Sequence, residues 1–470
     1  MSTRQLLGRT ADHAADYLDS LAERPVARPV DLAALRGAMG GEMPRAGVDA
    51  ATVIDDLVAS ADPGLVGCAG PRYFGFVIGG SVPAALAADW LTSAWDQNAG
   101  LYAISPAAAV AEEVAATWLV DLFGLPAGSS VGFTTGATMA SFTALAAGRH
   151  AVLRAAGWNA EEDGLFGAPP IAVVVGDEAH VTIFASLQML GLGRGRVHRV
   201  AADGQGRMRP DALRKVLAGI DGPILVCAQS GNVNTGAFDP LPEIVAAVRE
   251  RPNAWLHVDG AFGLWAATTP SLRPLVAGLG DADSWTTDAH KWLNVPYDSG
   301  IVIVRDAAAH HAAMALGAAY YVETDGKERD NYNWVPESSR RARGFAVHAA
   351  LRSLGRDGLA DMIDRCCALA RRMATALGAG DGVTILNDVV LNQVLVRFTA
   401  PDGDDDALTR RVIAAVQEDG TCWLGGTTWH GMAAMRISVS NWSTTEADAD
   451  ASVAAILRCR EAVLGAAAAR

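Results

Sequence analysis

The sequence predicts an α/β protein with a large, mainly parallel β-sheet and a smaller C-terminal α+β domain. Between residues 131 and 304, short apolar runs alternate with helical patterns, which is typical of strand–helix–strand units. The runs are continuously apolar, without a polar residue at every second position, so we expect a sheet that is buried on both faces. A chain of 470 residues, half of them hydrophobic, can bury a core of this size.

The elements are predicted in order along the chain. Pro25, Pro29 and Pro44 divide the first 70 residues into two or three helices. Two further helical patterns follow at 84–95 and 107–123. Strands are then expected at 131–134, 171–175, 197–200, 224–228, 254–258, 284–287 and 301–304, with helices at 139–156, 181–190 and 210–217.

The last part of the chain changes in character. From about residue 347, a helical pattern is followed by short strand patterns and a final helix, which suits a smaller domain. We therefore expect an N-terminal helical segment at 1–70, a large domain at 71–347 and a small C-terminal domain at 348–470.

The composition argues against several kinds of partner. The formal net charge is −14, the pI is about 5.1 and no basic cluster is present, which argues against nucleic acid or an anionic membrane surface. Six scattered cysteines without a metal-type CxxC pair fit a reducing cytoplasm and no metal site. The sequence has no run of about 18 apolar residues and no signal-peptide-like start. We therefore expect a cytoplasmic protein that acts on a small molecule.

The most specific chemical pattern is Asp288-Ala289-His290-Lys291, which follows a short strand. One large class of pyridoxal phosphate (PLP) enzymes presents its Schiff-base lysine directly after a histidine, and the amine must be neutral to attack. A solvated surface lysine is the alternative, but the neighbouring Trp292 and Leu293 argue against it.

Asp259 ends an apolar strand upstream of this lysine. A carboxylate in that place can pair with the protonated pyridine nitrogen of PLP and keep the ring an electron sink. Ala261, two residues further on, is small enough for the ring to lie flat against the backbone. The alternative is that Asp259 only caps the segment that begins at Gly260.

Two further groups lie where predicted strands end. Gly136, Ala137 and Thr138 open a helix, so their backbone N–H groups and the helix dipole can hold a phosphate. His180 ends another strand, at the edge where ligands bind in open α/β sheets, and its imidazole can stack on a planar ring. Taken alone, the first group is an ordinary turn and the second a hydrogen-bonded core histidine. Together with the lysine and the aspartate described above, they favour a PLP site.

Arg436 leads a predicted strand of the small domain. A planar guanidinium suits a substrate carboxylate, because it can donate two parallel hydrogen bonds. A surface ion pair is the alternative interpretation of this residue.

The sequence from about Pro71 to Asn441 resembles the group II PLP-dependent amino acid decarboxylases, which include aromatic amino acid, histidine and glutamate decarboxylases. The run Gly70-Pro71-Arg72-Tyr73-Phe74 is similar to the His-Pro-Arg-Phe-Phe motif of that family. Three runs are similar to the glutamate decarboxylase branch in particular. They are Leu86-Ala87-Ala88-Asp89-Trp90-Leu91-Thr92-Ser93, Tyr102-Ala103-Ile104-Ser105-Pro106 and Arg436-Ile437-Ser438-Val439-Ser440-Asn441.

The resemblance implies PLP-dependent fold type I, as in aspartate aminotransferase, with a seven-stranded sheet. It also implies an obligate homodimer with active sites at the interface and N-terminal helices packed across it. Residues 323–334 would form a mobile catalytic loop in which Tyr332 returns a proton. The implied contacts are phosphate at Gly136, Ala137 and Thr138, ring stacking at His180, ring-nitrogen pairing at Asp259, cofactor attachment at Lys291 and substrate carboxylate at Arg436.

Two departures separate this chain from the family pattern. The family usually has Asn-Pro-His-Lys, so Asp288 replaces an asparagine, and both Asp288 and His290 are candidate cofactor contacts. A carboxylate beside a phosphate is unfavourable unless it points away or is hydrogen-bonded. The family's Gly-Thr-Thr run becomes Gly231-Asn232-Val233, which puts Asn232 where a threonine is expected near the cofactor. These changes predict a divergent, bacterial-type subfamily.

The predicted function is PLP-dependent decarboxylation of an L-amino acid to the amine and carbon dioxide. The same scaffold can also run oxidative conversion of amines to aldehydes, transamination or aldol cleavage, and Tyr332 is the residue that favours decarboxylation. A non-catalytic homologue that acts as a binding protein is the remote alternative. The intact Lys291, Asp259 and His180 argue against it.

The substrate is open between two classes. Several tryptophans near candidate pocket segments favour an aromatic or other bulky amino acid, although core packing explains most tryptophans equally well. They are Trp95, Trp285, Trp292, Trp334 and Trp429. The resemblance to the glutamate branch favours a small acidic substrate instead, which would need a second cation.

Overall fold

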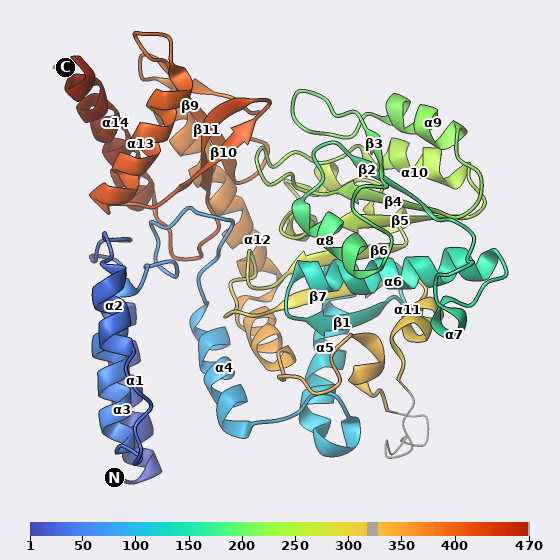
Figure 1. Ribbon diagram of the computed structural model, residues 1–470, viewed down its shortest axis with the longest axis horizontal. Helices are drawn as coiled ribbons and strands as arrows, with labels where there is room; N and C mark the ends of the chain where they lie inside the picture. Colours follow the sequence, from blue (N-terminus) through green and yellow to red (C-terminus); the bar gives the residue numbers. More distant parts are fainter. Residues whose placement is uncertain (317–327, 469–470) are drawn as a thin grey trace. The chain divides into compact units, whose positions relative to one another are not determined.

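The computed structural model describes residues 1–316 and 328–468. The chain forms two compact units, whose elements are labelled in Figure 1. The first, called here the terminal unit, comprises Met1–Ile78, Leu369–Leu386 and Val394–Arg470. The second, called here the central unit, comprises Gly79–Ala368 and Asn387–Gln393. The N-terminal helices therefore group with the C-terminal segments, which are distant from them in sequence.

A seven-stranded sheet forms the core of the central unit (Figure 1). The strands are β1 Ser130–Thr134, β2 Ala172–Gly176, β3 His198–Val200, β4 Ile224–Gln229, β5 Ala254–Asp259, β6 Ser284–Asp288 and β7 Gly300–Val304. Their order is β1-β7-β6-β5-β4-β2-β3, with β7 antiparallel to both its neighbours and the other pairs parallel. The mainly parallel sheet predicted from the sequence is therefore confirmed.

Helices cover this sheet. On one face, α6 (Ala137–Ala155) packs against β5, β6 and β7, while α8 (Val181–Met189) and α11 (Ala307–Met314) pack against α6. A further helix, α10 (Leu241–Arg249), contacts strands β4 and β5 and also packs on α9 (Pro210–Ala218). Every residue of β1, β4, β6 and β7 is buried, so these strands have no solvated face, which explains why β4 and β7 are almost entirely apolar.

The central unit also contains several further helices. They are α4 Pro83–Trp95, α5 Pro106–Leu122, α7 Ala160–Asp163, α12 Gly344–Gly378 and the 3₁₀ helices η2 Tyr102–Ile104, η3 Gly263–Thr268, η4 Arg273–Val276, η5 Leu279–Asp281 and η6 Asn331–Trp334. α12 continues into the terminal unit and is broken at Gly355, whose φ of 62° lies in the left-handed region that glycine adopts without strain.

The sequence patterns missed α7, α10 and α11. α11 has only eight residues and is rich in alanine, so its pattern carries no marked periodicity. Its start is fixed by Asp306, whose carboxylate accepts hydrogen bonds from the N–H groups of Ala308 and Ala309. Helices this short depend on tertiary packing, because isolated segments of their length are marginal in water.

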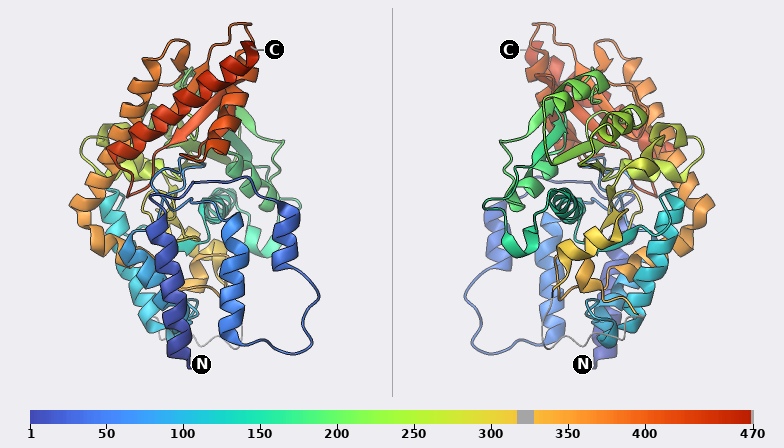
Figure 2. Two further views of the ribbon diagram at one scale, coloured as in Figure 1. Left: turned by 90° about the vertical axis from the view of Figure 1, so that its left-hand side faces the viewer. Right: turned by 90° about the vertical axis from the view of Figure 1, so that its right-hand side faces the viewer.

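The terminal unit combines N-terminal helices with a small sheet. Its N-terminal elements are α1 Thr3–Ser20, α2 Leu32–Met39, α3 Ala50–Ala61 and η1 Asp62–Gly64. Its strands are β8 Val383–Ile385, β9 Gln393–Phe398, β10 Gly425–Trp429 and β11 Met432–Ser438, in the order β10-β11-β9-β8. Figure 2 shows α13 (Asp405–Asp419) and α14 (Glu446–Ala468) side by side next to this sheet, in agreement with their contacts. The predicted smaller C-terminal α+β arrangement is confirmed.

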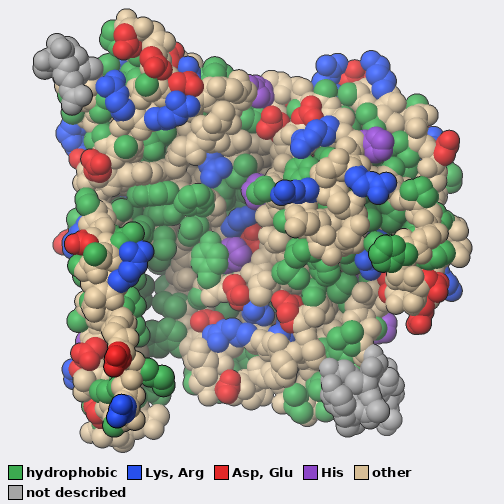
Figure 3. Space-filling model, in the orientation of Figure 1, with side chains coloured by type: hydrophobic (Ala, Val, Ile, Leu, Met, Phe, Trp, Pro, Cys, Tyr) green, Lys and Arg blue, Asp and Glu red, His purple; other side chains and the backbone are tan. Residues whose placement is uncertain are grey.

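Two general properties of the chain bear on its partners. Within residues 1–316 and 328–468, no helix combines the length and the apolar character that a membrane span requires. On the face of the protein shown in Figure 3, acidic and basic side chains are interspersed rather than gathered by sign.

Candidate active site

Lys291 lies in a tight turn that follows β6. Its Nζ is 2.8 Å from Asp288 Oδ2, and the side chains of Lys291 and Asp288 are 18% and 3% exposed. The turn is held by Asn294, whose side-chain N–H group donates to the carbonyl of Trp292 at 3.0 Å. Asn294 also accepts a hydrogen bond from the backbone N–H of Gly80 at 2.7 Å. Lys291 is therefore an ion-paired, largely buried group and not a solvated surface lysine.

The carboxylate of Asp288 also caps helix α6. Its Oδ1 accepts a hydrogen bond from the backbone N–H of Ala137 at 2.6 Å, where the N-cap residue Gly136 has no side chain of its own. The backbone N–H of Asp288 donates to the carbonyl of Ala261, and Trp265 Nε1 donates to the carbonyl of Asp288. Asp288 thus joins the end of β6 to the start of α6, two segments that the sequence placed in one site.

Gly300 allows these two segments to approach each other. It begins β7 and lies in the sheet between Thr134 of β1 and Asp288 of β6. A Cβ atom at this position would lie 2.4 Å from backbone atoms of Gly136. Gly300 was not predicted as a site residue, because a glycine before an apolar strand carries no signal of its own.

Gly300→Ala should therefore displace the start of α6 and weaken cofactor binding by at least about tenfold, because the added methyl group meets backbone atoms that cannot rotate away. Titration with PLP, followed by visible absorbance, measures the change. Gly195→Ala is the matched control in the same unit, since none of the described residues places a heavy atom within 4 Å of its Cβ position. Equal cofactor affinity in the two variants would contradict the importance of this close approach.

His290 is oriented by the neighbouring residue Ser299. The backbone N–H of Ser299 donates to His290 Nδ1 at 3.1 Å, and the Ser299 carbonyl accepts from the backbone N–H of His290. The imidazole stacks on Tyr297 with ring centroids 4.2 Å apart. Burial lowers the pKa of His290, so the ring is neutral near pH 7. Since Nδ1 accepts, the proton sits on Nε2, which faces Asp288 Oδ1 at 3.6 Å.

Asp259 is a buried carboxyl group at the end of β5. Its side chain accepts a hydrogen bond from the backbone N–H of Ala261 at 3.1 Å. Burial raises the pKa of Asp259, while the positive charges of His180 and Lys291 act in the opposite direction. A carboxylate that is desolvated in this way gains from a fixed cation close by. The position suits a protonated ring nitrogen.

His180 is the N-cap residue of α8. Its Nδ1 lies 2.8 Å from Thr182 Oγ1, which holds the ring at the carboxyl side of β2. With Asp259, Cys227 and Gln229, it lines one small cavity. The structure therefore brings His180 and Asp259 together, as the sequence predicted from two separate strand ends.

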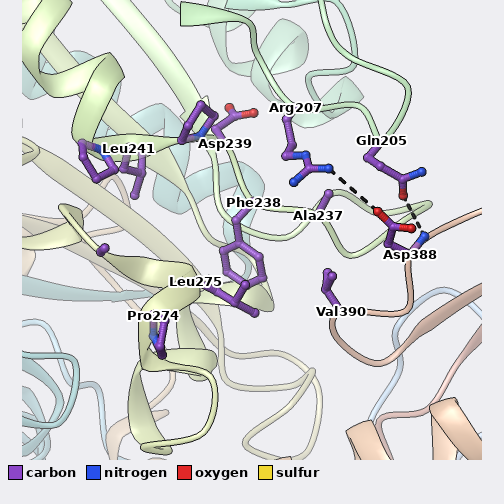
Figure 4. Close-up of a pocket in the computed structure, with 13 residues that line it drawn as sticks. Gln205, Arg207, Ala237, Phe238, Asp239, Leu241, Pro274, Leu275, Asp388 and Val390 are labelled. Atoms are coloured by element: carbon purple, nitrogen blue, oxygen red, sulfur yellow. Dashed lines mark hydrogen bonds and ion pairs between the residues drawn. The ribbon is translucent and has the colours of Figure 1, made fainter.

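A larger cavity of about 260 Å³ lies beside this small one. Figure 4 shows Arg207 and Asp388 pointing toward each other at its mouth, 4.0 Å apart, with Phe238 on its apolar side. Asp239 lines both cavities and accepts hydrogen bonds from two backbone N–H groups, including that of Gln229 at 2.7 Å. Burial raises the pKa of Asp239 to about 6. This carboxyl group forms the wall between the larger cavity and the candidate site.

Two predicted contact residues also make structural hydrogen bonds. The carbonyl of Thr138 accepts from Ser186 Oγ at 3.0 Å, which ties α6 to α8. Asn232 Oδ1 accepts from the backbone N–H groups of Asn234 and Thr235, at 2.8 and 3.2 Å. Asn232 therefore shapes its own turn, and within residues 1–316 and 328–468 its buried Nδ2 has no hydrogen-bond partner.

Tyr332 lies in η6, beside the outer edge of β1. Its side chain is 3% exposed, and its backbone N–H donates to the carbonyl of Gly100. Nearby, Arg329 donates to the free carbonyl of Val131 on this edge strand. Part of the predicted loop 323–334 lies outside the described residues, and its last residues are held against the sheet edge. The role of Tyr332 as a proton donor stays a prediction.

Arg436 lies on β11 in the terminal unit, where burial lowers the pKa of its guanidinium. Among the tryptophans, Trp285 and Trp292 are fully buried in the central unit, and Trp429 is 2% exposed in the terminal unit. The indole N–H of Trp285 donates to the carbonyl of Leu279. Core packing accounts for these three tryptophans without a substrate pocket.

The site as a whole fits PLP in its donor set. An anion-binding helix start at Ala137, the amine of Lys291 and the buried carboxyl of Asp259 lie at the ends of strands on one edge of the sheet. These match a phosphate, an aldehyde and a basic ring nitrogen, which are three groups of PLP that a protein can bind. The fold and the site define a PLP-dependent enzyme of fold type I.

The sequence matches the family described as "Pyridoxal-dependent decarboxylase conserved domain" over residues 35–399. It is 33% identical over 374 residues to L-2,4-diaminobutyrate decarboxylase of Rhizobium meliloti (strain 1021), covering 78% of this chain and 72% of that protein. It is 25% identical over 455 residues to aromatic-L-amino-acid decarboxylase of Bacillus atrophaeus, covering 94% and 92%. The chain belongs to the pyridoxal-dependent decarboxylase family, and PLP is its cofactor.

Solved structures confirm the fold. The crystal structure of Oryza sativa TDC with PLP and tryptamine superposes with a TM-score of 0.91 at 23% identity, covering 98% of each chain. The crystal structure of mouse CSAD superposes with a TM-score of 0.89 at 24% identity, covering 97% of this chain and 98% of that chain. At these identities, the similarity establishes the shared fold.

Proposed function

We propose that the protein converts an L-amino acid to the corresponding amine and carbon dioxide, with Lys291 as the residue that holds PLP covalently. The observation that carries this proposal is the arrangement of Lys291, Asp259 and the start of α6 at one sheet edge, in a chain of the decarboxylase family. When bound, PLP supplies an electron sink for the electron pair that remains after carbon dioxide leaves.

Different residues of the central unit are proposed to bind different parts of the cofactor. The backbone N–H groups from Gly136 to Thr138 are proposed to bind its phosphate, with the partial positive charge of the α6 N-terminus. His180 is proposed to stack on the ring and Asp259 to keep the ring nitrogen protonated. Ala261, Asn232, His290 and Asp288 complete the proposed cofactor contacts.

The substrate is proposed to be held through its carboxylate by Arg436. Its guanidinium is mostly buried, and a desolvated arginine binds a carboxylate more strongly than an exposed one does. By their names, the relatives act on L-2,4-diaminobutyrate, aromatic amino acids and acidic amino acids, so these three classes are the first to be tested.

The active protein is proposed to be a cytoplasmic homodimer with active sites at the interface. The N-terminal helices expose apolar side chains that a second copy would cover. They include Leu7, Leu18, Val53, Leu57 and Val58. The six cysteines all lie among the described residues and form no disulfide with one another, which fits a reducing compartment. Covering such apolar side chains is the usual source of dimer stability.

Tyr332→Phe tests the proposed proton donor. If the hydroxyl returns the proton, the variant keeps cofactor binding and loses amine formation by roughly 100-fold or more. Phenylalanine preserves the buried ring, so packing around η6 is retained. Tyr17→Phe, in α1 of the terminal unit, serves as the control. Turnover within about threefold of wild type would assign Tyr332 a structural role and exclude it as the donor.

The function is tested with a panel of L-amino acids, incubated with the PLP-loaded protein and analysed by mass spectrometry. We expect an amine and carbon dioxide from one class of substrate. A 2-oxo acid or an aldehyde would keep the cofactor assignment but contradict decarboxylation. No turnover of any member, with PLP covalently bound, would favour a binding protein instead.

A further inference from the structure

Asp288 is the residue at which this chain departs from the usual family asparagine, and the structure gives it three partners. Its Oδ1 accepts from the Ala137 N–H at 2.6 Å, its Oδ2 lies 2.8 Å from Lys291 Nζ, and its Oδ1 lies 3.6 Å from His290 Nε2. With a side chain 3% exposed, Asp288 is shielded from water. One buried carboxylate therefore contacts both the helix start that suits a phosphate and the amine that suits the cofactor aldehyde.

The position of this carboxylate creates a conflict with a bound phosphate. The Ala137 N–H is one of the N-terminal donors of α6 that have no partner within the helix, and it already donates to Asp288 Oδ1. Two anions at one helix start repel each other strongly, because the buried site is poorly screened by water and salt. The negative charge of Asp288 must be removed or moved away before a phosphate can bind there.

The ion pair with Lys291 creates a second conflict. The Asp288 carboxylate and the Lys291 ammonium group form a salt bridge, with Oδ2 2.8 Å from Nζ. An ammonium has no free electron pair, so it must lose one proton before its nitrogen can attack an aldehyde carbon. Asp288 Oδ2 lies 2.8 Å from Nζ and can accept that proton.

We propose that Asp288 is a positioning residue that occupies the anion site of α6 and holds Lys291 as ammonium until the cofactor arrives. This inference rests on the proposed attachment of PLP at Lys291. On binding, the ammonium proton passes from Lys291 Nζ to Asp288 Oδ2. The neutral amine then forms a C=N bond in place of the aldehyde C=O bond, with release of one water. Neutral Asp288 becomes a hydrogen-bond donor and no longer repels the phosphate.

One proton transfer thus resolves both conflicts. The same transfer that makes Lys291 nucleophilic removes the charge that opposes phosphate, so attachment and phosphate binding are coupled through Asp288. A protonated carboxyl group and an asparagine amide can both donate a hydrogen bond, which explains how aspartate can replace the usual asparagine here.

The test uses the full chain after removal of the cofactor and compares wild type with Asp288→Asn. Inorganic phosphate, titrated by calorimetry, reports on the anion site alone. We expect Asp288→Asn to bind phosphate at least about tenfold more tightly than wild type, because a like charge has been removed. Pyridoxal, which lacks the phosphate, reports on the amine alone. We expect its visible adduct with Lys291 to form at least about tenfold faster in the variant.

Two further variants keep the result interpretable. Asp283→Asn is the matched control, because Asp283 precedes the same strand, accepts the Leu256 N–H and pairs with Arg249, away from the site. It should leave both measurements at wild-type values. If Asp288→Asn does not fold, Asp288→Ser removes the same charge with a smaller side chain.

The outcomes are distinct. Tighter phosphate binding together with faster pyridoxal capture supports the proposal, and a wild-type value in either measurement overturns it. If PLP itself fails to attach to Lys291 in the wild-type protein, the proposed function is wrong. The phosphate titration remains a separate measurement, because it involves no cofactor.

Discussion

Lys291→Ala is expected to abolish covalent attachment of PLP and to lower turnover by roughly 10³-fold or more, as when a reacting nucleophile is removed. The only lysines in the sequence are Lys215, Lys291 and Lys327. Reduction of the wild-type protein with borohydride, followed by peptide mass spectrometry, should therefore place the cofactor on Lys291. A trapped cofactor on either of the other two lysines would contradict the site described above.

Lys291→Ala should also lower the stability of the protein, and this effect must be distinguished from the loss of the reacting amine. Removal of Lys291 leaves the Asp288 carboxylate buried without its cation, and breaking such a pair costs about 3–5 kcal/mol. Lys291→Arg avoids this loss, because a guanidinium keeps the positive charge but cannot form the covalent bond. We expect Lys291→Arg to fold and to lack the trapped cofactor, while Lys215→Ala, at an exposed position, behaves as wild type.

Asp259→Asn is expected to bind PLP and to lose turnover by at least roughly 100-fold, the size of effect found when one preorganised electrostatic partner is removed. An amide can still accept the hydrogen bond from the Ala261 N–H, so the local backbone is retained. It cannot keep a proton on the ring nitrogen, because it carries no negative charge. Turnover near that of wild type, with equal cofactor content, would remove Asp259 from the mechanism.

The same substitution should have the opposite effect on stability. Because burial raises the pKa of Asp259, the folded protein binds a proton at this site more tightly than the unfolded chain does. Stability from this group is therefore present at low pH and is lost as pH rises through the folded pKa. We expect cofactor-free Asp259→Asn to melt at a higher temperature than wild type near neutral pH, with a smaller difference in acid. A difference that grew in acid would contradict this sign.

Opposite effects on activity and stability would separate a functional carboxylate from a structural one. A structural carboxylate such as Asp283 pairs with Arg249 and accepts the Leu256 N–H, so its removal costs stability. Asp259 instead accepts a backbone hydrogen bond from Ala261, and burial raises its pKa although the charges of His180 and Lys291 act in the opposite direction.

Much of the fold could be predicted because its signal is local. The seven strands of the central sheet formed within one residue of the expected bounds, and strands such as β4 and β7 were recognisable because they are apolar runs buried on both faces. α6 was recognised from a long apolar pattern, whereas α11 was missed because its eight residues pack through tertiary contacts. Periodicity reports how a segment faces the core and carries little information about short helices.

The residues of the candidate site were likewise predicted only in part. Lys291 and Asp259 were found because a reactive group at a strand end stands out against an apolar run. Gly300 and Ser299 were missed, although Gly300 provides the close approach to Gly136 and Ser299 orients a ring nitrogen of His290. These residues act through partners that are distant in sequence, so no spacing along the chain marks them.

The sequence by itself determined the fold class, the family pattern and the candidate lysine and aspartate, because each depends on residue types at short spacing. Only the tertiary structure decided what Asp288 contacts. Its two oxygens meet the start of α6, 151 residues away, and the amine of Lys291. Whether a carboxylate repels a phosphate or serves as a proton acceptor depends on distances between groups that the sheet brings together. Those distances follow from the order of strands, which local residue patterns do not encode.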